Sequence, residues 1–151
     1  MGRYTLRTAV ALCSAALLGA AVTTACAAPP AAHAVRQPAG PPVLVDCFWH
    51  PHVRPAGFML ACGDGNSRLT SLHWTKWDAN SATAQGLNVV NDCKPYCAAG
   101  RFHAYRVDVR LDHPRTWKRH PHLTQYSRIS LTYADSRPQG FTRVVAYPLW
   151  N

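Results

Sequence analysis

Apolar and polar residues alternate with a period of two in several short segments of this chain, and such alternation predicts β-strands that bury one face. The clearest example covers residues 105–111, where aromatic and aliphatic residues alternate with arginine and aspartate. Residues 128–133 repeat the pattern, and residues 141–147 form a last extended segment that ends at Pro148. Each of these segments is expected to place one face in a core and the other in solvent.

Two earlier segments, residues 43–49 and 58–62, also place apolar side chains and one cysteine each on a single face. The residues between them are rich in proline and include a glycine, which predicts a turn. Folding the two segments antiparallel about residues 54 and 55 sets Cys47 opposite Cys62. The sequence therefore predicts a hairpin closed by a disulfide between these two cysteines.

The remaining segments complete an all-β pattern. Residues 69–77 and 81–91 are two further predicted strands, the first of them preceded by a tight Gly-Asp-Gly-Asn turn at residues 63–66. Residues 112–124 are polar, basic and interrupted by two prolines, which predicts a long exposed connection. With no amphipathic helix in the pattern, we expect about seven short, mainly antiparallel strands in a sandwich or a partly closed barrel.

Trp74 and Trp77 are three residues apart in one predicted strand. A regular strand would place them on opposite faces, which would leave one of them exposed as a binding-surface aromatic. A β-bulge between them would bring both rings into the core. We favour the core for both.

The N-terminal 25 residues have the features of a signal sequence. Arg3 and Arg7 give it a positive start, and residues 8–22 are small, mostly apolar and uncharged. The apolar run is short for a membrane-spanning helix. The sequence therefore predicts export from the cytoplasm.

Residues 22–25, just before Cys26, resemble a bacterial lipobox, in which the cysteine is lipidated and becomes the new N-terminus. Thr23 stands where a strict lipobox has an aliphatic residue, so ordinary cleavage at a small-x-small site, at residues 25–27 or 32–34, is the alternative. We favour lipidation of Cys26. This predicts a protein anchored to the outer face of the cell membrane, whereas the alternative predicts a secreted one.

The residues after Cys26 are mainly alanine and proline, with few bulky side chains. A segment of this composition buries little surface and is expected to be extended, at about 3.1 Å per residue for a proline-rich chain. Residues 26–42 would thus form an anchor and tether of on the order of 50 Å. A single β-domain is predicted for residues 43–151.

The chain is strongly basic, with a formal net charge of +9. All seven acidic residues are aspartates, and the part of the chain after the predicted signal sequence keeps 14 of the 16 basic residues. Such a surface attracts anionic envelope polymers or lipid headgroups. An envelope protein is a third candidate partner, and nucleic acid is not expected. The alternative to a charged partner is that the positive charge serves only to keep the protein soluble.

Four cysteines follow the predicted anchor, and in an oxidising compartment they predict two disulfides. With Cys47 assigned to Cys62, the second bridge joins Cys93 to Cys97. A Cys-x-x-x-Cys pair also occurs in copper-delivery and thiol-redox proteins, but those are built on βαβ scaffolds that this pattern lacks. We therefore expect both bridges to be structural.

The tripeptide His-Pro-His occurs twice, and four imidazoles, from His50, His52, His120 and His122, would suit zinc or copper if they met. The sequence does not bring the two pairs together, and both are expected in proline-broken loops with no carboxylate close by in sequence to orient a ring. Surface histidines are the expectation. A metal-binding protein or a hydrolase built on clustered histidines is the alternative.

Basic residues surround an aromatic one at Arg115, Trp117, Lys118 and Arg119. This mixture is typical of contacts with anionic ligands, including phosphate backbones and membrane interfaces. The alternative is that Trp117 folds back over an edge of the sheet. No serine-hydrolase elbow or zincin helix is present, so we expect a binding or scaffold module rather than an enzyme, with no cofactor.

One pattern resembles that of small exported or lipid-anchored actinobacterial proteins, a family whose function is not known. Its elements are Cys62-Gly63-Asp64-Gly65-Asn66, Leu72-His73-Trp74, Trp77, and Asn91-x-Cys93-x-Pro95-x-Cys97-Ala98-x-Gly100. The resemblance covers roughly residues 43–147 and implies export, a single domain and an all-β fold. It implies no catalytic or binding residue.

Overall fold

The computed structural model of this chain describes residues 40–150. Within them nearly all regular structure is β, as predicted from the alternation. The strands are β1 (Leu44–Val45), β2 (Pro51–His52), β3 (Phe58–Met59), β4 (Ser67–Trp77), β5 (Ala82–Asn91), β6 (Phe102–Trp117), β7 (His120–Tyr133) and β8 (Val144–Pro148), and a single 3₁₀ turn, η1, covers Cys97–Ala99. The predicted signal sequence, Cys26 and most of the predicted tether lie outside the described residues.

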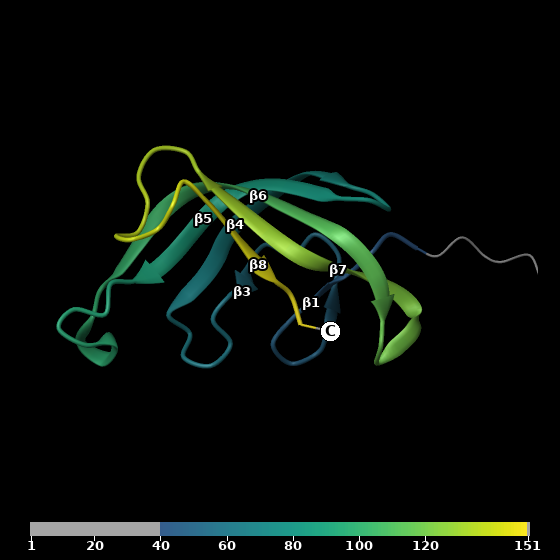
Figure 1. Cartoon of the computed structure of the whole chain (residues 1–151), viewed down its shortest axis with the longest axis horizontal. Coiled ribbons are helices and arrows are strands. Elements are labelled where there is room, and N and C mark those ends of the chain that lie inside the picture. The colour runs from purple at the N-terminus through teal and green to yellow at the C-terminus, as the bar shows by residue number, and fades with distance from the viewer. Residues whose placement is uncertain (1–39, 151) are drawn as a thin grey trace, which may run out of the picture. The chain divides into compact units, whose positions relative to one another are not determined.

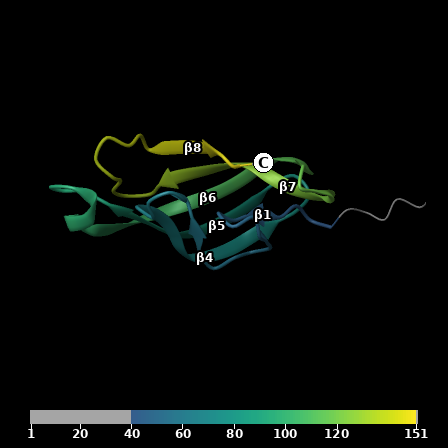
Figure 2. The same cartoon turned by 90° about the horizontal axis from the view of Figure 1, so that it is seen from below.

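Six strands form one antiparallel sheet in sequence order, from β3 at one edge to β8 at the other. The sheet is curled into a half-barrel, which is the partly closed form of the predicted architecture. In Figure 1 the sheet arches over the small β1–β2 pair and the C-terminal residues. The view in Figure 2 shows the same sheet from below, with β8 and β4 toward opposite sides. Among residues 40–150 there is no helix that is long and apolar enough to cross a membrane.

The core fills the concave side of the arch. The predicted alternation in β6 and β7 is confirmed, because Val109 pairs with Leu131 and Leu111 pairs with Ile129, and all four side chains are buried. Segments outside the long strands close the core from below, including Leu44, Phe58 and Leu149. The other face of β6, with its arginines and aspartate, is left on the outside.

The predicted exposed connection at residues 112–124 is wrong. β6 and β7 continue through this segment as one long hairpin, in which Pro114 pairs with Tyr126 and the strands end at Trp117 and His120. Both prolines have exposed side chains, and Val43 adds backbone hydrogen bonds to this part of β7. Proline is tolerated in a strand where its missing N–H is not needed by a neighbour. Sequence composition therefore suggested a loop where pairing and burial form a strand.

The disulfide between Cys47 and Cys62 is confirmed, with 5.5 Å between the two Cα atoms, but the hairpin used to predict it is wrong. β1 pairs with β2 instead, and β3 pairs with β4. The cause is an early turn at Asp46, whose carboxylate accepts hydrogen bonds from the backbone N–H groups of Phe48 and His50. The predicted bridge between Cys93 and Cys97 is also confirmed.

Both tryptophans of β4 are in or against the core, as favoured above. The register of β4 against β5 shifts between Trp74 and Lys76, so a bulge turns both rings to one side. The ring centroids are 4.6 Å apart in an edge-to-face contact. Their indole N–H groups donate to the carbonyls of Pro55 and Pro42. These two hydrogen bonds attach the segments that contain Pro42 and Pro55 to β4.

Candidate anion-binding surface

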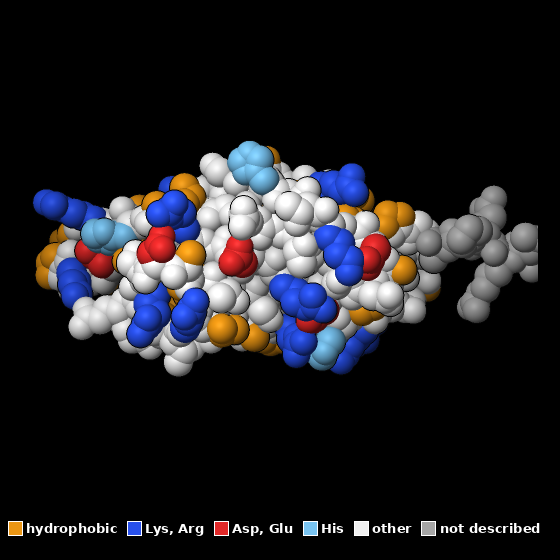
Figure 3. All heavy atoms as spheres, turned by 90° about the horizontal axis from the view of Figure 1, so that it is seen from above, with side chains coloured by type: hydrophobic (Ala, Val, Ile, Leu, Met, Phe, Trp, Pro, Cys, Tyr) orange, Lys and Arg blue, Asp and Glu red, His pale blue; other side chains and the backbone are white. Residues whose placement is uncertain are grey.

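The convex face of the sheet is polar, and the strand register aligns its side chains in rows that cross the strands. Gln85, Asp108 and Thr132 form one row across β5, β6 and β7. Thr83, Arg110 and Ser130 form the next. Figure 3 looks onto this face and shows most Lys and Arg side chains toward its two ends, with few charged side chains between them.

Asp112 is the centre of one charged group on this face. It is only 7% exposed, and its register partner on β7 is Arg128. Arg128 donates from Nε to Oδ1 at 2.7 Å and from Nη2 to Oδ2 at 2.8 Å, while Arg110 donates from Nε to Oδ2 at 3.1 Å. The hydrogen bonds from Arg128 lower the pKa of Asp112, although burial acts in the opposite direction.

A groove of about 320 Å³ lies beside this group, between the β6–β7 hairpin and the end of β8. Its lining includes His113, Arg115 and Arg128. Arg115 is exposed and makes no ion pair among residues 40–150. We call Arg110, Asp112, His113, Arg115 and Arg128 the Asp112 surface.

The Asp112 surface carries three guanidinium groups against one carboxylate. Asp112 uses part of the donor capacity of Arg110 and Arg128 and fixes their orientation. The remaining N–H groups of these partly exposed side chains are available to a ligand. A planar guanidinium held in this way suits the oxygens of a phosphate or carboxylate. The arrangement can therefore bind an anion.

The predicted contact segment is divided by the structure. Arg115 belongs to the Asp112 surface. Trp117 does not take part, because it is fully buried with Val43 and Val45, as in the alternative that folds it back onto the sheet. Arg119 lies over the ring of Trp49, 3.9 Å from the ring centroid. Lys118 lies in the turn between β6 and β7.

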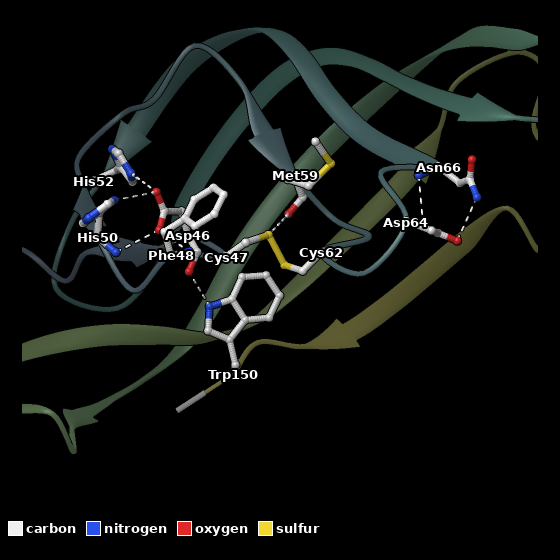
Figure 4. The surroundings of a disulfide bond; sticks show 10 residues. All are labelled: Asp46, Cys47, Phe48, His50, His52, Met59, Cys62, Asp64, Asn66 and Trp150. Atoms are coloured by element: carbon white, nitrogen blue, oxygen red, sulfur yellow. Dashed lines mark hydrogen bonds and ion pairs between the residues drawn. A yellow bond between two sulfur atoms is a disulfide. The ribbon is translucent and has the colours of Figure 1, made fainter. Parts of the chain in front are cut away.

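His50 and His52 meet a carboxylate that the sequence interpretation overlooked. His52 Nε2 lies 2.9 Å and His50 Nδ1 3.5 Å from Asp46 Oδ2. Burial raises the pKa of Asp46, but the hydrogen bonds from His52 and from two backbone N–H groups outweigh it and lower the pKa to about 2. Figure 4 shows both rings pointing to Asp46, next to the disulfide between Cys47 and Cys62. The statement that no carboxylate is near in sequence was wrong.

The second His-Pro-His tripeptide has a different environment. The ring of His120 lies against Trp117, with 4.4 Å between centroids, and 5.8 Å separates its centroid from that of His122. Among the residues that the structure describes, no group of three or more histidine, cysteine, aspartate or glutamate side chains is arranged to hold a metal ion. The four histidines therefore do not form the predicted alternative metal site.

Arg110 and Arg128 were not among the residues predicted from the sequence to contact a ligand. Their alternation with apolar residues placed them on the wet face of strands, but only the register shows that both meet Asp112. Asp112 itself was assigned to an exposed connection. The alternation in the sequence shows which face of its strand each residue occupies. It does not show which residues of two strands lie opposite each other, and that register brings the two arginines to Asp112.

Comparisons of the chain with protein-family models, curated proteins and solved structures find no match. The resemblance to exported actinobacterial proteins therefore stays a prediction.

Proposed function

We propose that this protein is an exported, non-enzymatic binding module of the cell envelope that binds an anionic polymer at the Asp112 surface. The observation that carries this proposal is the nearly buried carboxylate of Asp112, which orients Arg110 and Arg128, with Arg128 lining the same groove as the unpaired Arg115. Arginine in excess of carboxylate leaves positive charge on the surface. The two disulfides are in keeping with a location outside the cytoplasm.

A polymer is favoured over a membrane surface as the ligand. Binding in a membrane interface requires exposed apolar or aromatic side chains beside the basic ones. Trp117, the aromatic residue that the sequence offered for this role, is fully buried. Tyr147, which is 37% exposed, does line the groove, but a phenol ring with a polar hydroxyl is a small apolar surface beside three arginines. The Asp112 surface contributes mainly charge and hydrogen bonds, which suit the repeated phosphates or carboxylates of a polymer.

The proposed attachment to the membrane depends on Cys26. A lipid on this cysteine and the alanine- and proline-rich tether after it would hold the β-domain near the wall polymers while it remains membrane-bound. Intact-mass analysis of the exported protein tests this part separately. A diacylglyceryl adduct on Cys26 is expected, and an unmodified N-terminus at Ala28 or Val35 would remove the anchor from the proposal.

The binding proposal is tested with poly(glycerol phosphate) and the full exported chain, by calorimetry over a range of salt concentrations. Affinity should fall steeply as salt rises, because the polymer releases counterions when it binds a cationic surface. Arg110→Gln and Arg115→Gln should each weaken binding about two- to fivefold, since an exposed ion pair contributes up to about 1 kcal/mol. Arg128 remains to pair with the buried carboxylate in both variants.

Lys76→Gln is the matched control for loss of one positive charge. Lys76 is half exposed and is already paired with Asp78, 3.0 Å away. An equal effect of Lys76→Gln and Arg115→Gln would show that net charge alone drives binding and would overturn the assignment to the Asp112 surface. Binding to phosphatidylglycerol vesicles but not to the polymer would also overturn it.

A further inference from the structure

The geometry points to a second binding site at the other end of the sheet, for a sugar unit that carries a phosphate or carboxylate group. A cleft of about 570 Å³ lies there between the end of β5, the start of β6 and the β7–β8 connection. Figures 1 and 2 both place the β5–β6 and β7–β8 connections together, away from the β6–β7 turn. The cleft is separate from the Asp112 surface, and neither proposal depends on the other.

The cleft contains two cations that are held in place by neutral partners. Lys94 Nζ donates to Gln139 Oε1 at 2.7 Å, and Arg137 Nε donates to the carbonyl oxygen of Phe141 at 2.8 Å. Neither cation forms an ion pair within residues 40–150, unlike Arg106, which pairs with Asp135. Their positive charge is thus oriented but not neutralised. An anion that entered the cleft would provide the missing partner.

Lys94 belongs to a loop with several independent restraints, residues 92–100, which we call the disulfide loop. The bridge between Cys93 and Cys97 closes it, and Asn91 donates from Nδ2 to the carbonyl oxygen of Cys97 at 2.8 Å and accepts from the backbone N–H of Cys93 at 3.0 Å. Asp92 accepts from the backbone N–H of Arg101 at 2.9 Å. A loop ordered before binding loses less conformational entropy when a ligand binds.

The cleft also has surfaces for a ring. Tyr105 and Phe141 both line it, and each packs edge-on against Tyr133, with 6.2 Å between centroids. Aromatic rings of this kind can cover the apolar C–H faces of a sugar. His103, which is held by Asp92 at 3.0 Å, adds a polar group to the lining. The carboxylate of Asp92 also lines the cleft, but its partners are the backbone N–H groups of Lys94 and Arg101 and the ring of His103, not the two cations. Ring surfaces beside two cations without a carboxylate partner favour an anionic saccharide over a bare anion or a neutral sugar.

The test is a titration of the full exported chain, followed by NMR, with N-acetylglucosamine 1-phosphate and N-acetylmuramic acid as the two anionic probes. Neutral N-acetylglucosamine and inorganic phosphate are the comparison ligands. At least one anionic sugar should bind more tightly than both comparison ligands and should shift the signals of Tyr105 and Gln139. The tighter of the two identifies phosphate or carboxylate as the preferred group.

Lys94→Gln and Arg137→Gln should each weaken binding of that sugar about two- to fivefold, as expected for loss of one exposed ion pair. Arg115→Gln, at the Asp112 surface, should leave it unchanged. Melting temperatures of the variants show that they fold. Equal affinity for the neutral sugar, equal affinity for inorganic phosphate, no saturation by either anionic sugar, or an equal loss with Arg115→Gln would each overturn the proposal. None of these results bears on polymer binding at the Asp112 surface.

Discussion

Gly100 packs so closely against Asn91 that a methyl group at position 100 would overlap the Oδ1 atom of that side chain. The same oxygen accepts a hydrogen bond from the backbone N–H of Cys93, so it has little room to move. Gly100→Ala should lower the free energy of unfolding by about 1–3 kcal/mol, as overpacking usually does. Urea denaturation of the full chain measures this. Gly63→Ala is the control, since a Cβ there meets no atom within 4 Å, and an equal loss in both variants would contradict the explanation.

The two disulfides should contribute differently to stability. Cys47 and Cys62 are 15 residues apart, and Cys93 and Cys97 only 4. Loop-closure entropy then gives about 3 kcal/mol for the first bridge and about 2 kcal/mol for the second. Replacing Cys47 and Cys62 together by alanine should therefore lower the urea midpoint more than replacing Cys93 and Cys97.

Hydrogen exchange separates the local roles of these bridges. Loss of the bridge between Cys93 and Cys97 should raise exchange mainly within the disulfide loop. Loss of the bridge between Cys47 and Cys62 should raise it throughout the core, because that bridge joins the segments that cover the concave face. The reverse pattern would show that the short bridge stabilises the whole domain.

Acid should destabilise the domain through a small set of aspartates. The pKa of Asp46, Asp78 and Asp92 is lowered from 3.8 to about 2 in the folded protein, and Asp78 owes this first to the backbone N–H groups of Asn80 and Ser81. Because the folded pKa is below the unfolded one, these groups stabilise the fold fully at pH values above the unfolded pKa. That contribution is lost as the pH falls from about 4 through about 2.

Asp78→Asn tests this pH dependence at a position outside both proposed binding sites. An amide does not ionise, so the stability difference between wild type and Asp78→Asn should be largest near neutral pH and should shrink between about pH 4 and pH 2. Thermal unfolding at a series of pH values gives the difference directly. A difference that stays constant from pH 6 to pH 2 would assign the effect of the substitution to something other than the charge.

Substitutions at Trp117 and Arg115 should separate stability from binding, although only Thr116 lies between these residues in β6. Trp117 is fully buried, and Trp117→Ala should cost about 3–5 kcal/mol of stability, as is usual for a buried large aromatic. Arg115 is exposed, and Arg115→Gln should change stability by no more than about 0.5 kcal/mol. Urea denaturation measures both. A small loss of stability for Trp117→Ala would contradict the burial of this side chain and would make it a candidate ligand contact again.

The sequence predicts this fold best where side-chain period and burial coincide. In β6 and β7 the alternation identified the buried face correctly, because each inward residue meets an inward residue of the neighbouring strand. It failed at residues 112–124, where two prolines and many charges suggested a loop. There, burial of Trp117 under β1 and the backbone pairing with Val43 outweigh local composition.

The candidate site was harder to predict because its residues are brought together by strand pairing. Asp112 and Arg128 are far apart in the chain and become neighbours only through the β6–β7 register. Asp46 shows the local counterpart, since it is close to His50 and His52 in sequence, but its role depends on a turn of specific geometry. Cys47 and Cys62 were paired correctly from an incorrect strand pairing: the bridge forms, but Cys47 is only partly buried, Cys62 is exposed, and the two strands predicted to carry them do not pair with each other.

The hydrogen bond between the Tyr133 hydroxyl and Asn88 Oδ1, at 2.8 Å, connects β7 to β5 inside the core. Asn88 is itself 1% exposed and uses its amide N–H groups on Ser67 and on the carbonyl of Arg68. Tyr133→Phe would leave the buried Oδ1 atom without its donor, which should cost about 1–3 kcal/mol. Tyr105→Phe is the matched control, because the Tyr105 hydroxyl makes no hydrogen bond among residues 40–150 and its loss should change stability by less than about 0.5 kcal/mol. Urea denaturation of both variants measures these losses of stability. Equal small losses would mean that Asn88 Oδ1 finds another donor. The contact between β5 and β7 would then depend on apolar packing alone.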